Sequence, residues 1–383
     1  MSATPRTGPQ APLVVIGLSA RMLAVSAARA GLCPVAIDLF ADRDTRAVAR
    51  CIALPSLEQE PVLAVLKKIV AERGRPWLVY GSGIDTRPDL VERISEIADL
   101  VGNAPPALRL LHHPGTFFEL LDALAIPYPE TCFTRPENPY AWVFKIPFTE
   151  GGRGVLPGAA HPDDVSGYYQ KELEGPAMSV LFLANRREAL ILGFNTQWTA
   201  GPDAPSPYLF SGIMDIAELR PRQKTQLGGY ATKLVKSASL VGLNSLDFLI
   251  EHGECQVLEL NPRPGASLIL YDKRFTYGLL NEHIRAVKGL AVNRPSPEQP
   301  GCCGLEIVYA EQPCEVGPEM RWPDWTHDRP MPGIKIAAGE ALCTVTANAL
   351  TGKRLRMLLS QRKRQIHDRV FGLVENNKYW SEG

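Results

Sequence analysis

The feature that most constrains this chain is a pair of apolar, strand-forming segments that carry oxygen ligands. One spans residues 244–250 and contains Asp247, and the other spans residues 257–261 and contains Glu259 and Asn261. Because successive side chains of a strand point to opposite faces, Glu259 and Asn261 share a face, and Asp247 can meet them from an adjacent strand. Mg2+ prefers one or two carboxylates together with nucleotide phosphates. The spacing therefore predicts a magnesium site and ATP chemistry, although the solvated face of an edge strand would carry the same residues.

A second segment combines a lysine with a loop rich in glycine. Residues 142–145 form a short apolar strand that ends in Lys145, and the loop after it holds Gly151, Gly152, Arg153 and Gly154. Glycines let backbone N–H groups surround phosphate oxygens, because no Cβ blocks the required φ values. Lys145 would add a positive charge whose burial favours an anionic partner. A lysine that extends to solvent before a plain hairpin is the alternative interpretation.

A third segment, residues 168–182, contains a strand end, a Glu-Gly turn and a new apolar strand. Such a hinge could hold the edge of an adenine with its backbone and the ring with Leu173. A simple linker between two strands would have the same pattern. The residues of this segment that we consider for nucleotide binding are Gln170, Lys171, Leu173 and Glu174.

In this order and spacing, the three segments resemble the ATP-grasp superfamily of carboxylate–amine ligases over roughly residues 105 to 295. The resemblance implies an α/β multi-domain fold in which two α+β lobes clamp ATP, with a small lobe at about residues 140–185. It implies that Lys145 and the glycine loop bind phosphates and that residues 170–174 bind the nucleotide. It also implies that Mg2+ or Mn2+ is held by Asp247, Glu259 and Asn261.

The resemblance further implies two catalytic residues, Lys145 and Arg263, and Arg263 corresponds to an arginine that faces the acyl phosphate or the acceptor. Two positions depart from the family pattern. His113 and Pro114 stand where a phosphate-binding lysine is common, and residues 177–179 lack the acid that usually binds the ribose. Arg153 or His113 could replace the missing charge, and Glu174 is the nearest acid.

The flanking regions predict further domains. Residues 11–104 begin with a βαβ unit that indicates a Rossmann-like parallel sheet, but its first turn lacks the second and third glycines of a dinucleotide site. In ATP-grasp ligases such a domain lines the acceptor pocket, so Ser19, Arg21 and Ser82 are candidate substrate contacts, with turn and capping roles as the alternative. We expect residues 1–10 to be a disordered tail and residues 302–383 a small β-rich module with a final helix.

Composition narrows the classes of partner. The 383 residues are 45% hydrophobic, enough for several cores, and the 41 basic and 41 acidic residues give a formal net charge of zero. This balance argues against nucleic-acid and membrane binding, and it favours small-molecule carboxylate and amine substrates. Eight cysteines without a Cys-x-x-Cys pair, and the lack of a signal peptide or spanning run, predict a cytoplasmic protein. We also expect a homodimer.

These observations converge on one hypothesis. A carboxylate attacks the γ-phosphate of Mg-ATP, an acyl phosphate forms, and an amine converts it to an amide; no residue stands out as the general base. Residues 173–182 resemble predicted ligases of one-carbon metabolism in methylotrophs, which implies glutamate ligation in cofactor biosynthesis. The alternatives are a carboxylating ligase that uses bicarbonate, a nucleotide-binding module without catalysis, and a nicotinamide oxidoreductase.

Overall fold

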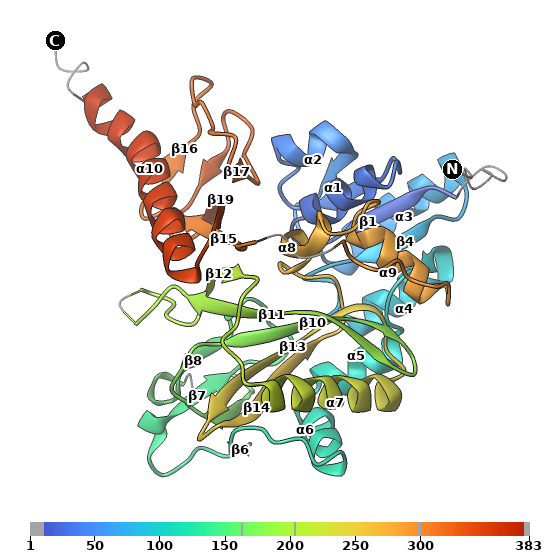
Figure 1. Cartoon of the computed structure of the whole chain (residues 1–383). Helices are drawn as coiled ribbons and strands as arrows, with labels where there is room; N and C mark the ends of the chain where they lie inside the picture. Colours follow the sequence, from blue (N-terminus) through green and yellow to red (C-terminus); the bar gives the residue numbers. More distant parts are fainter. Residues whose placement is uncertain (1–10, 162–163, 203, 297–299, 379–383) are drawn as a thin grey trace.

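The N-terminal part of the chain is built on a five-stranded parallel sheet in the order β3-β2-β1-β4-β5. The structure is a computed structural model that describes residues 11–161, 164–202, 204–296 and 300–378 (Figure 1). Its inner strands are short runs of valine, isoleucine and leucine, as expected for strands buried on both faces. The strands are β1 (Leu13–Ile16), β2 (Val35–Asp38), β3 (Arg50–Ala53), β4 (Trp77–Tyr80) and β5 (Asp99–Leu100).

Four helices accompany these strands: α1 (Arg21–Arg29), α2 (Arg43–Val48), α3 (Gln59–Arg73) and α4 (Pro88–Ile97). The strand order reverses between β1 and β4, so the loops after these two strands flank the crevice where open parallel sheets bind ligands. Those loops carry Ser19 and Ser82.

An eight-stranded sheet, antiparallel in its pairings, runs through the rest of the molecule. One face is covered by α5 (Pro105–His112), α6 (Pro114–Ala123) and α7 (Pro221–Ala238), and the leucines, valines and phenylalanines of these helices share a core with the strands (Figure 1). In spatial order the strands are β14 (Glu254–Asn261), β13 (Val241–Glu251), β10 (Met178–Asn185), β11 (Ala189–Thr199), β12 (Phe210–Met214), β15 (Cys302–Tyr309), β19 (Ala341–Ala349) and β17 (Thr326–His327).

A four-stranded antiparallel sheet forms the small lobe. It consists of β6 (Thr131–Cys132), β9 (Tyr168–Lys171), β7 (Trp142–Lys145) and β8 (Val155–Pro157), with the short helical turns Pro139–Ala141 and Gly158–Ala160 beside them. The small lobe expected at about residues 140–185 is therefore shifted. Its sheet begins at Thr131 and ends at Lys171, because residues 178–185 pair with β11 and β13 in the large sheet.

Two helices that follow β14 in the sequence, α8 (Leu268–Asp272) and α9 (Leu279–Val287), lie against α1 of the N-terminal sheet (Figure 1). Asp272 is buried, accepts a hydrogen bond from Ser26 and pairs with Arg29 at 3.0 Å. The apolar residues of α8 and α9 join the same core as those of β1 and α1. The chain thus returns from the large sheet to the N-terminal sheet before it enters the C-terminal region.

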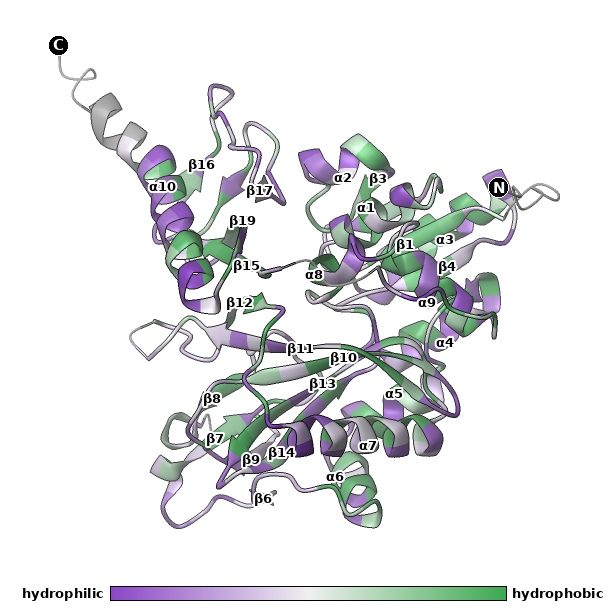
Figure 2. Cartoon of the chain, viewed as in Figure 1, coloured by the Kyte–Doolittle hydropathy of each residue, from purple (hydrophilic) through white to green (hydrophobic). Residues whose placement is uncertain are grey.

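The C-terminal region continues the large sheet instead of standing apart from it, because β15 pairs with β12. A small ribbon of β16 (Cys314–Glu315) and β18 (Lys335–Ile336) and the helix α10 (Gly352–Lys378) complete it. Leu355 and Leu359 of α10 are fully buried, which confirms the amphipathic packing expected for this helix. Figure 2 shows that β1 and β10 are largely hydrophobic, whereas α7 and α10 carry long hydrophilic stretches.

The overall fold expected from the sequence is confirmed: a Rossmann-like N-terminal sheet, two α+β lobes and a β-rich C-terminal region ending in a helix. All eight cysteines lie in the described residues and are free thiols. In that part of the chain, no helix combines the length and the apolar composition that crossing a membrane requires.

Candidate active site

The oxygen ligands predicted from the sequence meet where β13 and β14 pair. Asp247 lies opposite Glu259, and the amide nitrogen of Asn261 donates to Glu259 Oε1 at 3.1 Å and to Asp247 Oδ2 at 3.4 Å. Burial raises the pKa of Asp247 well above its usual value, and the neighbouring Glu259 charge raises it further. Two carboxylates this close favour a divalent cation between them.

The described residues contain no group of three or more His, Cys, Asp or Glu side chains that could hold a metal ion. A metal at this place would therefore depend on Asp247, Glu259 and the amide oxygen of Asn261. This donor set is small for a metal held by protein alone, but it fits Mg2+, which usually keeps several waters or phosphate oxygens among its ligands.

Lys145, the last residue of β7, faces these carboxylates. Its Nζ donates to Gln170 Oε1 at 2.7 Å, and Gln170 Nε2 donates to Thr131 Oγ1 at 3.1 Å. Burial lowers the pKa of Lys145, while the charges of Glu259 and Asp247 act to raise it. The buried Gln170 side chain, which we expected to contact the nucleotide, thus supports the lysine from within the small lobe.

The loop after Lys145 packs onto the large lobe. Phe210 N donates to Gly151 O at 2.8 Å, and Val155 N donates to Gly152 O at 3.1 Å. At Gly152 the φ angle is +77°, and a Cβ atom would lie 1.9 Å from the carbonyl oxygen of Tyr208. Only glycine fits this close approach, so the loop composition is explained by its contact with the segment before β12.

Arg263 lies two residues beyond Asn261 and is only 9% exposed. Its Nε lies 3.1 Å from Asp85 Oδ1, and its Nη2 donates to Asn261 Oδ1 at 3.1 Å. His112 Nε2 lies 3.2 Å from the other oxygen of Asp85. Burial acts to raise the pKa of Asp85, but the Arg263 charge and the contacts of Arg263 and His112 together outweigh it, and the pKa is lowered. The fully buried Asp85 is therefore one link between the N-terminal domain and the candidate site.

Residues from most of these elements line a cleft of about 110 Å3. Small-molecule sites commonly enclose about 300–1,000 Å3. The cleft as it stands is therefore smaller than such a site. The polar side chains and glycines of the lining are Thr86, His112, Lys145, Thr149, Glu150, Gly151, Gly152, Tyr168, Glu259, Asn261 and Arg263.

Several residues expected at the site lie outside this lining: Arg153, Gly154, Gln170, Lys171, Leu173, Glu174 and Asp247. Asp247 still touches it through Asn261. Successive side chains of β9 point to opposite faces, so Lys171 does not share the face of Gln170. The amine of Lys171 lies 4.0 Å from the Glu130 carboxylate instead. Nucleotide binding by residues 171–174 remains a proposal that would depend on their backbone.

The structure also shows which basic side chains lie near the position where related proteins carry a phosphate-binding lysine. His113 caps α6, with its Nδ1 accepting from Thr116 N at 3.4 Å, and so does not replace the lysine. Arg153 is exposed outside the cleft. The preceding residue, His112, lines the cleft instead. Sequence reasoning missed His112, Asp85 and Glu150; the only signal was that Asp85 follows a Gly-Ser-Gly turn and that Glu150 precedes the glycines.

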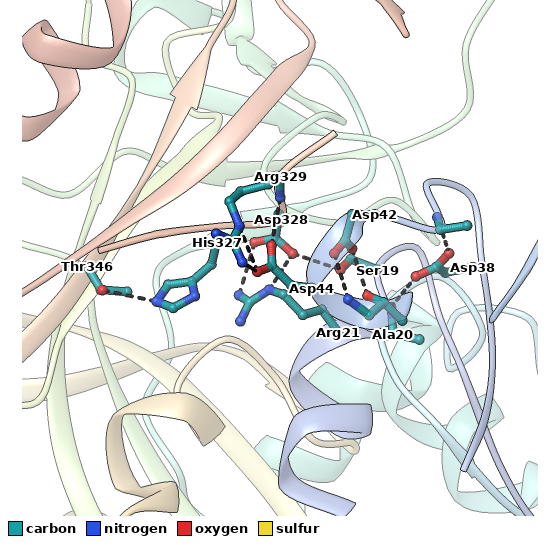
Figure 3. Close-up of polar contacts among 12 residues, drawn as sticks. Ser19, Ala20, Arg21, Asp38, Asp42, Asp44, His327, Asp328, Arg329 and Thr346 are labelled. Carbon is teal, nitrogen blue, oxygen red and sulfur yellow. Dashed lines mark hydrogen bonds and ion pairs between the residues drawn. The ribbon is translucent and has the colours of Figure 1, made fainter. Parts of the chain in front are cut away.

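Two candidate acceptor contacts, Ser19 and Arg21, are engaged elsewhere (Figure 3). Arg21 binds Asp328 of the C-terminal region through two contacts, Nε to Oδ1 at 2.7 Å and Nη2 to Oδ2 at 3.0 Å. Ser19 donates to the same carboxylate at 3.1 Å, and Arg329 pairs with Asp44 beside it. The expected substrate contact by these two residues is not supported, because they hold the C-terminal region against the N-terminal domain.

Comparison with known proteins finds a similar domain and a similar fold elsewhere. Residues 116–267 match the family model described as "ATP-grasp domain". Among curated proteins, the chain is 24% identical over 267 residues to the carbamoyl phosphate synthase large chain of Acidobacterium capsulatum, covering 63% of this chain and 24% of that protein. The chain thus spans about a quarter of the length of this relative.

Solved structures with the same fold include a biotin carboxylase from Campylobacter jejuni, with a TM-score of 0.68, 14% identity and coverage of 89% of this chain and 88% of that chain. The biotin carboxylase domain of the Hydrogenobacter thermophilus 2-oxoglutarate carboxylase has a TM-score of 0.70 and 12% identity, and the match covers 92% of this chain and 88% of that chain. The N5-carboxyaminoimidazole ribonucleotide synthetase of Thermus thermophilus has a TM-score of 0.67 and 14% identity, and the match covers 92% of this chain and 98% of that chain. The resemblance inferred from the three segments is confirmed: this chain carries an ATP-grasp domain and has the fold of the ATP-grasp superfamily.

Proposed function

We propose that this protein is an ATP-dependent ligase that activates a carboxylate as an acyl phosphate and joins it to an amine. The observation that carries the proposal is the arrangement of charge around one cleft. Lys145 faces the carboxylates of Asp247 and Glu259, and the buried guanidinium of Arg263 stands beside them. Cations and a metal-binding carboxylate pair around one small cavity suit the transfer of a phosphoryl group.

In the first step, a carboxylate oxygen of the substrate attacks the γ-phosphorus of ATP, the bond from that phosphorus to the bridging oxygen breaks, and ADP leaves. Lys145 and the backbone of the glycine loop stabilise the charge on the transferring group, which is catalysis by positioning and electrostatics. Asp247, Glu259 and Asn261 would hold Mg2+, which would neutralise phosphate charge.

In the second step, the amine attacks the acyl carbon, the bond from that carbon to the phosphate oxygen breaks, and inorganic phosphate leaves. Arg263 is suited to hold the acyl phosphate, because a guanidinium binds carboxylate and phosphate oxygens with paired N–H donors and stays protonated. Asp85 fixes its Nε from the side of the N-terminal domain. The guanidinium is thereby oriented before the substrate arrives.

Bicarbonate is a second candidate for the acid, and the comparisons favour it specifically. One solved neighbour is described in complex with MgADP and the bicarbonate anion, and others are carboxylases or a carboxyamino-forming synthetase. The narrower expectation, glutamate as the acid in cofactor biosynthesis, is tested beside it.

The test is a phosphate-release screen of the purified full chain with Mg-ATP, crossing glutamate, other amino acids and bicarbonate against a panel of amines. We expect release that depends on one acid and one amine. Glu259→Gln should abolish it, whereas the matched variant Glu254→Gln, on the same strand but exposed and paired with Arg222, should retain it.

Two outcomes would overturn the proposal. Tight ATP binding with no release for any pair would indicate a nucleotide-binding module without catalysis. Thermal stabilisation by a nicotinamide dinucleotide, with no response to ATP, would indicate an oxidoreductase.

A further inference from the structure

Glu150, which precedes the glycines of the small-lobe loop, has a carboxylate without a structural task. Its Oε2 atom is buried in the wall of the cleft, and no hydrogen-bond partner for it exists among the described residues. The Ser82 hydroxyl of the N-terminal domain hydrogen-bonds to the side chain. Buried polar atoms in proteins are nearly always paired, so an unpaired carboxylate oxygen at a cleft points to a ligand.

The position of Glu150 is the acceptor side of the candidate site. The oxygen ligands and Lys145 belong to the two lobes, whereas Glu150 meets the loop that follows β4, where the strand order of the N-terminal sheet reverses. Ligands of open parallel sheets enter at such a point. A substrate that arrives there would meet the Glu150 carboxylate and the Arg263 guanidinium together.

The charged groups around Glu150 come from three elements. Asp85 and Arg87 belong to the N-terminal domain, and Arg263 follows β14. His112 lines the same cleft and contacts Asp85. Burial raises the pKa of Glu150 and the Asp85 charge adds to this, while Arg263, Ser82 and Arg87 act against it. A carboxyl group whose pKa moves toward neutrality is a better proton acceptor at working pH.

We propose that Glu150 is the general base that removes a proton from the attacking amine, which deepens the proposed function and rests on it. The ammonium form of the acceptor gives one proton to Glu150 Oε2. The freed nitrogen lone pair attacks the acyl carbon, the bond from that carbon to the phosphate oxygen breaks, and the second proton leaves with inorganic phosphate.

The test compares two nucleophiles in the full-length enzyme, using the acid identified by the screen. Hydroxylamine is already unprotonated at neutral pH and needs no base, whereas an aliphatic amine does. We expect Glu150→Gln to lower the rate of amide formation with the aliphatic amine by about 10²–10⁴-fold. Hydroxamate formation should stay within about threefold of wild type. Raising the pH should restore the amide rate, because a larger fraction of the amine is then free.

Two further variants complete the design. Glu150→Asp keeps a carboxylate and should retain more amide formation than Glu150→Gln. Glu137→Gln, an exposed position of the same lobe, should behave as wild type with both nucleophiles. Thermal unfolding of each variant checks that the fold is intact.

Equal losses with hydroxylamine and with the aliphatic amine would overturn the assignment, because Glu150 would then act in phosphoryl transfer or loop closure. An unchanged amide rate in Glu150→Gln would overturn it as well. Failure of the proposed function would give a different result, because wild type would then release no phosphate with either nucleophile. The assignment of Glu150 as the base would be wrong in that case too.

Discussion

Two buried arginines each pair with an aspartate across the contact between the N-terminal domain and the rest of the molecule, and the two pairs differ in their surroundings. Arg21 of the N-terminal domain pairs with Asp328 of the C-terminal region, and Asp85 of the N-terminal domain pairs with Arg263 after β14. In both, burial opposes the charge of the aspartate, yet the arginine and the other hydrogen-bonding neighbours together keep its pKa below the usual value. The two pairs are thus alike in electrostatics.

The geometry separates them. The guanidinium of Arg21 uses two nitrogens on the two oxygens of Asp328, and Ser19 fills a further site on that carboxylate (Figure 3). Asp85 receives a single contact from Arg263, whose Nη2 points to the candidate metal ligand Asn261. Arg263 also lines a cleft, which Arg21 does not.

The comparison teaches that burial of an ion pair does not by itself indicate function. A carboxylate whose oxygens are occupied by one arginine and a hydroxyl can hold two domains together but has little to offer a ligand. An arginine fixed at one nitrogen beside a cavity keeps donors for a substrate. The first pair is expected to govern stability, and the second activity.

The largest expected effect follows from removing one charge of the structural pair. Asp328→Asn removes the carboxylate that the buried Arg21 guanidinium contacts and leaves it only the charges of Asp42 and Asp44, which should lower the free energy of unfolding by about 3 kcal/mol. The φ angle of Asp328 is +53°, a conformation that asparagine tolerates, so the loss reports the charge. Urea denaturation at pH 7 measures it, with the exposed Asp324→Asn as the matched control. A loss no greater than that of the control would contradict the structural role.

The second prediction exchanges the two arginines for lysine. Arg263→Lys should reduce kcat by about 10²–10³-fold, because a point charge does not reproduce the guanidinium geometry. Arg21→Lys should destabilise the fold, while the enzyme that remains folded keeps its kcat within about twofold. Steady-state phosphate release, normalised to folded protein, compares the two. The comparison breaks if Arg21→Lys loses as much activity as Arg263→Lys.

The fold could be predicted from the sequence where its pattern is local. The apolar runs that became β1, β2, β4, β13 and β14 are each bounded by turn residues, and their period identifies them. Pairing between distant segments leaves no such pattern. Nothing in Cys302–Tyr309 indicates that it would extend the large sheet beside Phe210–Met214, so this region was expected to form a separate module.

The candidate site divides in the same way. Glu259 and Asn261 share a face because of strand alternation, and their meeting with Asp247 needs only one strand pairing. Asp85 and Glu150 come together only when the N-terminal sheet docks against the small lobe. Such contacts between domains depend on tertiary packing, which a single sequence does not encode in any short window.

The third prediction concerns pH and Asp42, the N-cap of α2 beside the structural pair. Burial and then the charge of Asp328 raise the pKa of Asp42 to about 6. This pKa lies above the pKa of Asp42 in the unfolded chain, so the folded state holds the proton more tightly. The stability that the protonated Asp42 contributes is complete below about pH 4 and is lost as the pH rises through 6. Asp42→Asn keeps the cap and removes this titration, so wild type should lose up to about 3 kcal/mol relative to the variant between pH 4 and 7. Urea denaturation across this range measures it, and parallel curves would contradict the shift.

The smallest effect separates the two regions by their serines. Ser19 donates to the carboxylate of Asp328, and a hydrogen bond to a charged group contributes about 1.5–3 kcal/mol. Ser19→Ala should therefore lower the free energy of unfolding by about 1.5 kcal/mol and leave activity unchanged.

Ser82 donates to Glu150 and acts to lower its pKa. Ser82→Ala should therefore move the acidic limb of the pH–rate profile upward, with a smaller loss of stability than Ser19→Ala. Thermal unfolding and pH–rate profiles of both variants give the result. The two variants could instead lose the same stability, with no shift of either pH–rate profile. Ser82 would then have a structural role like that of Ser19, and the two arginine–aspartate pairs would differ less than their geometry indicates.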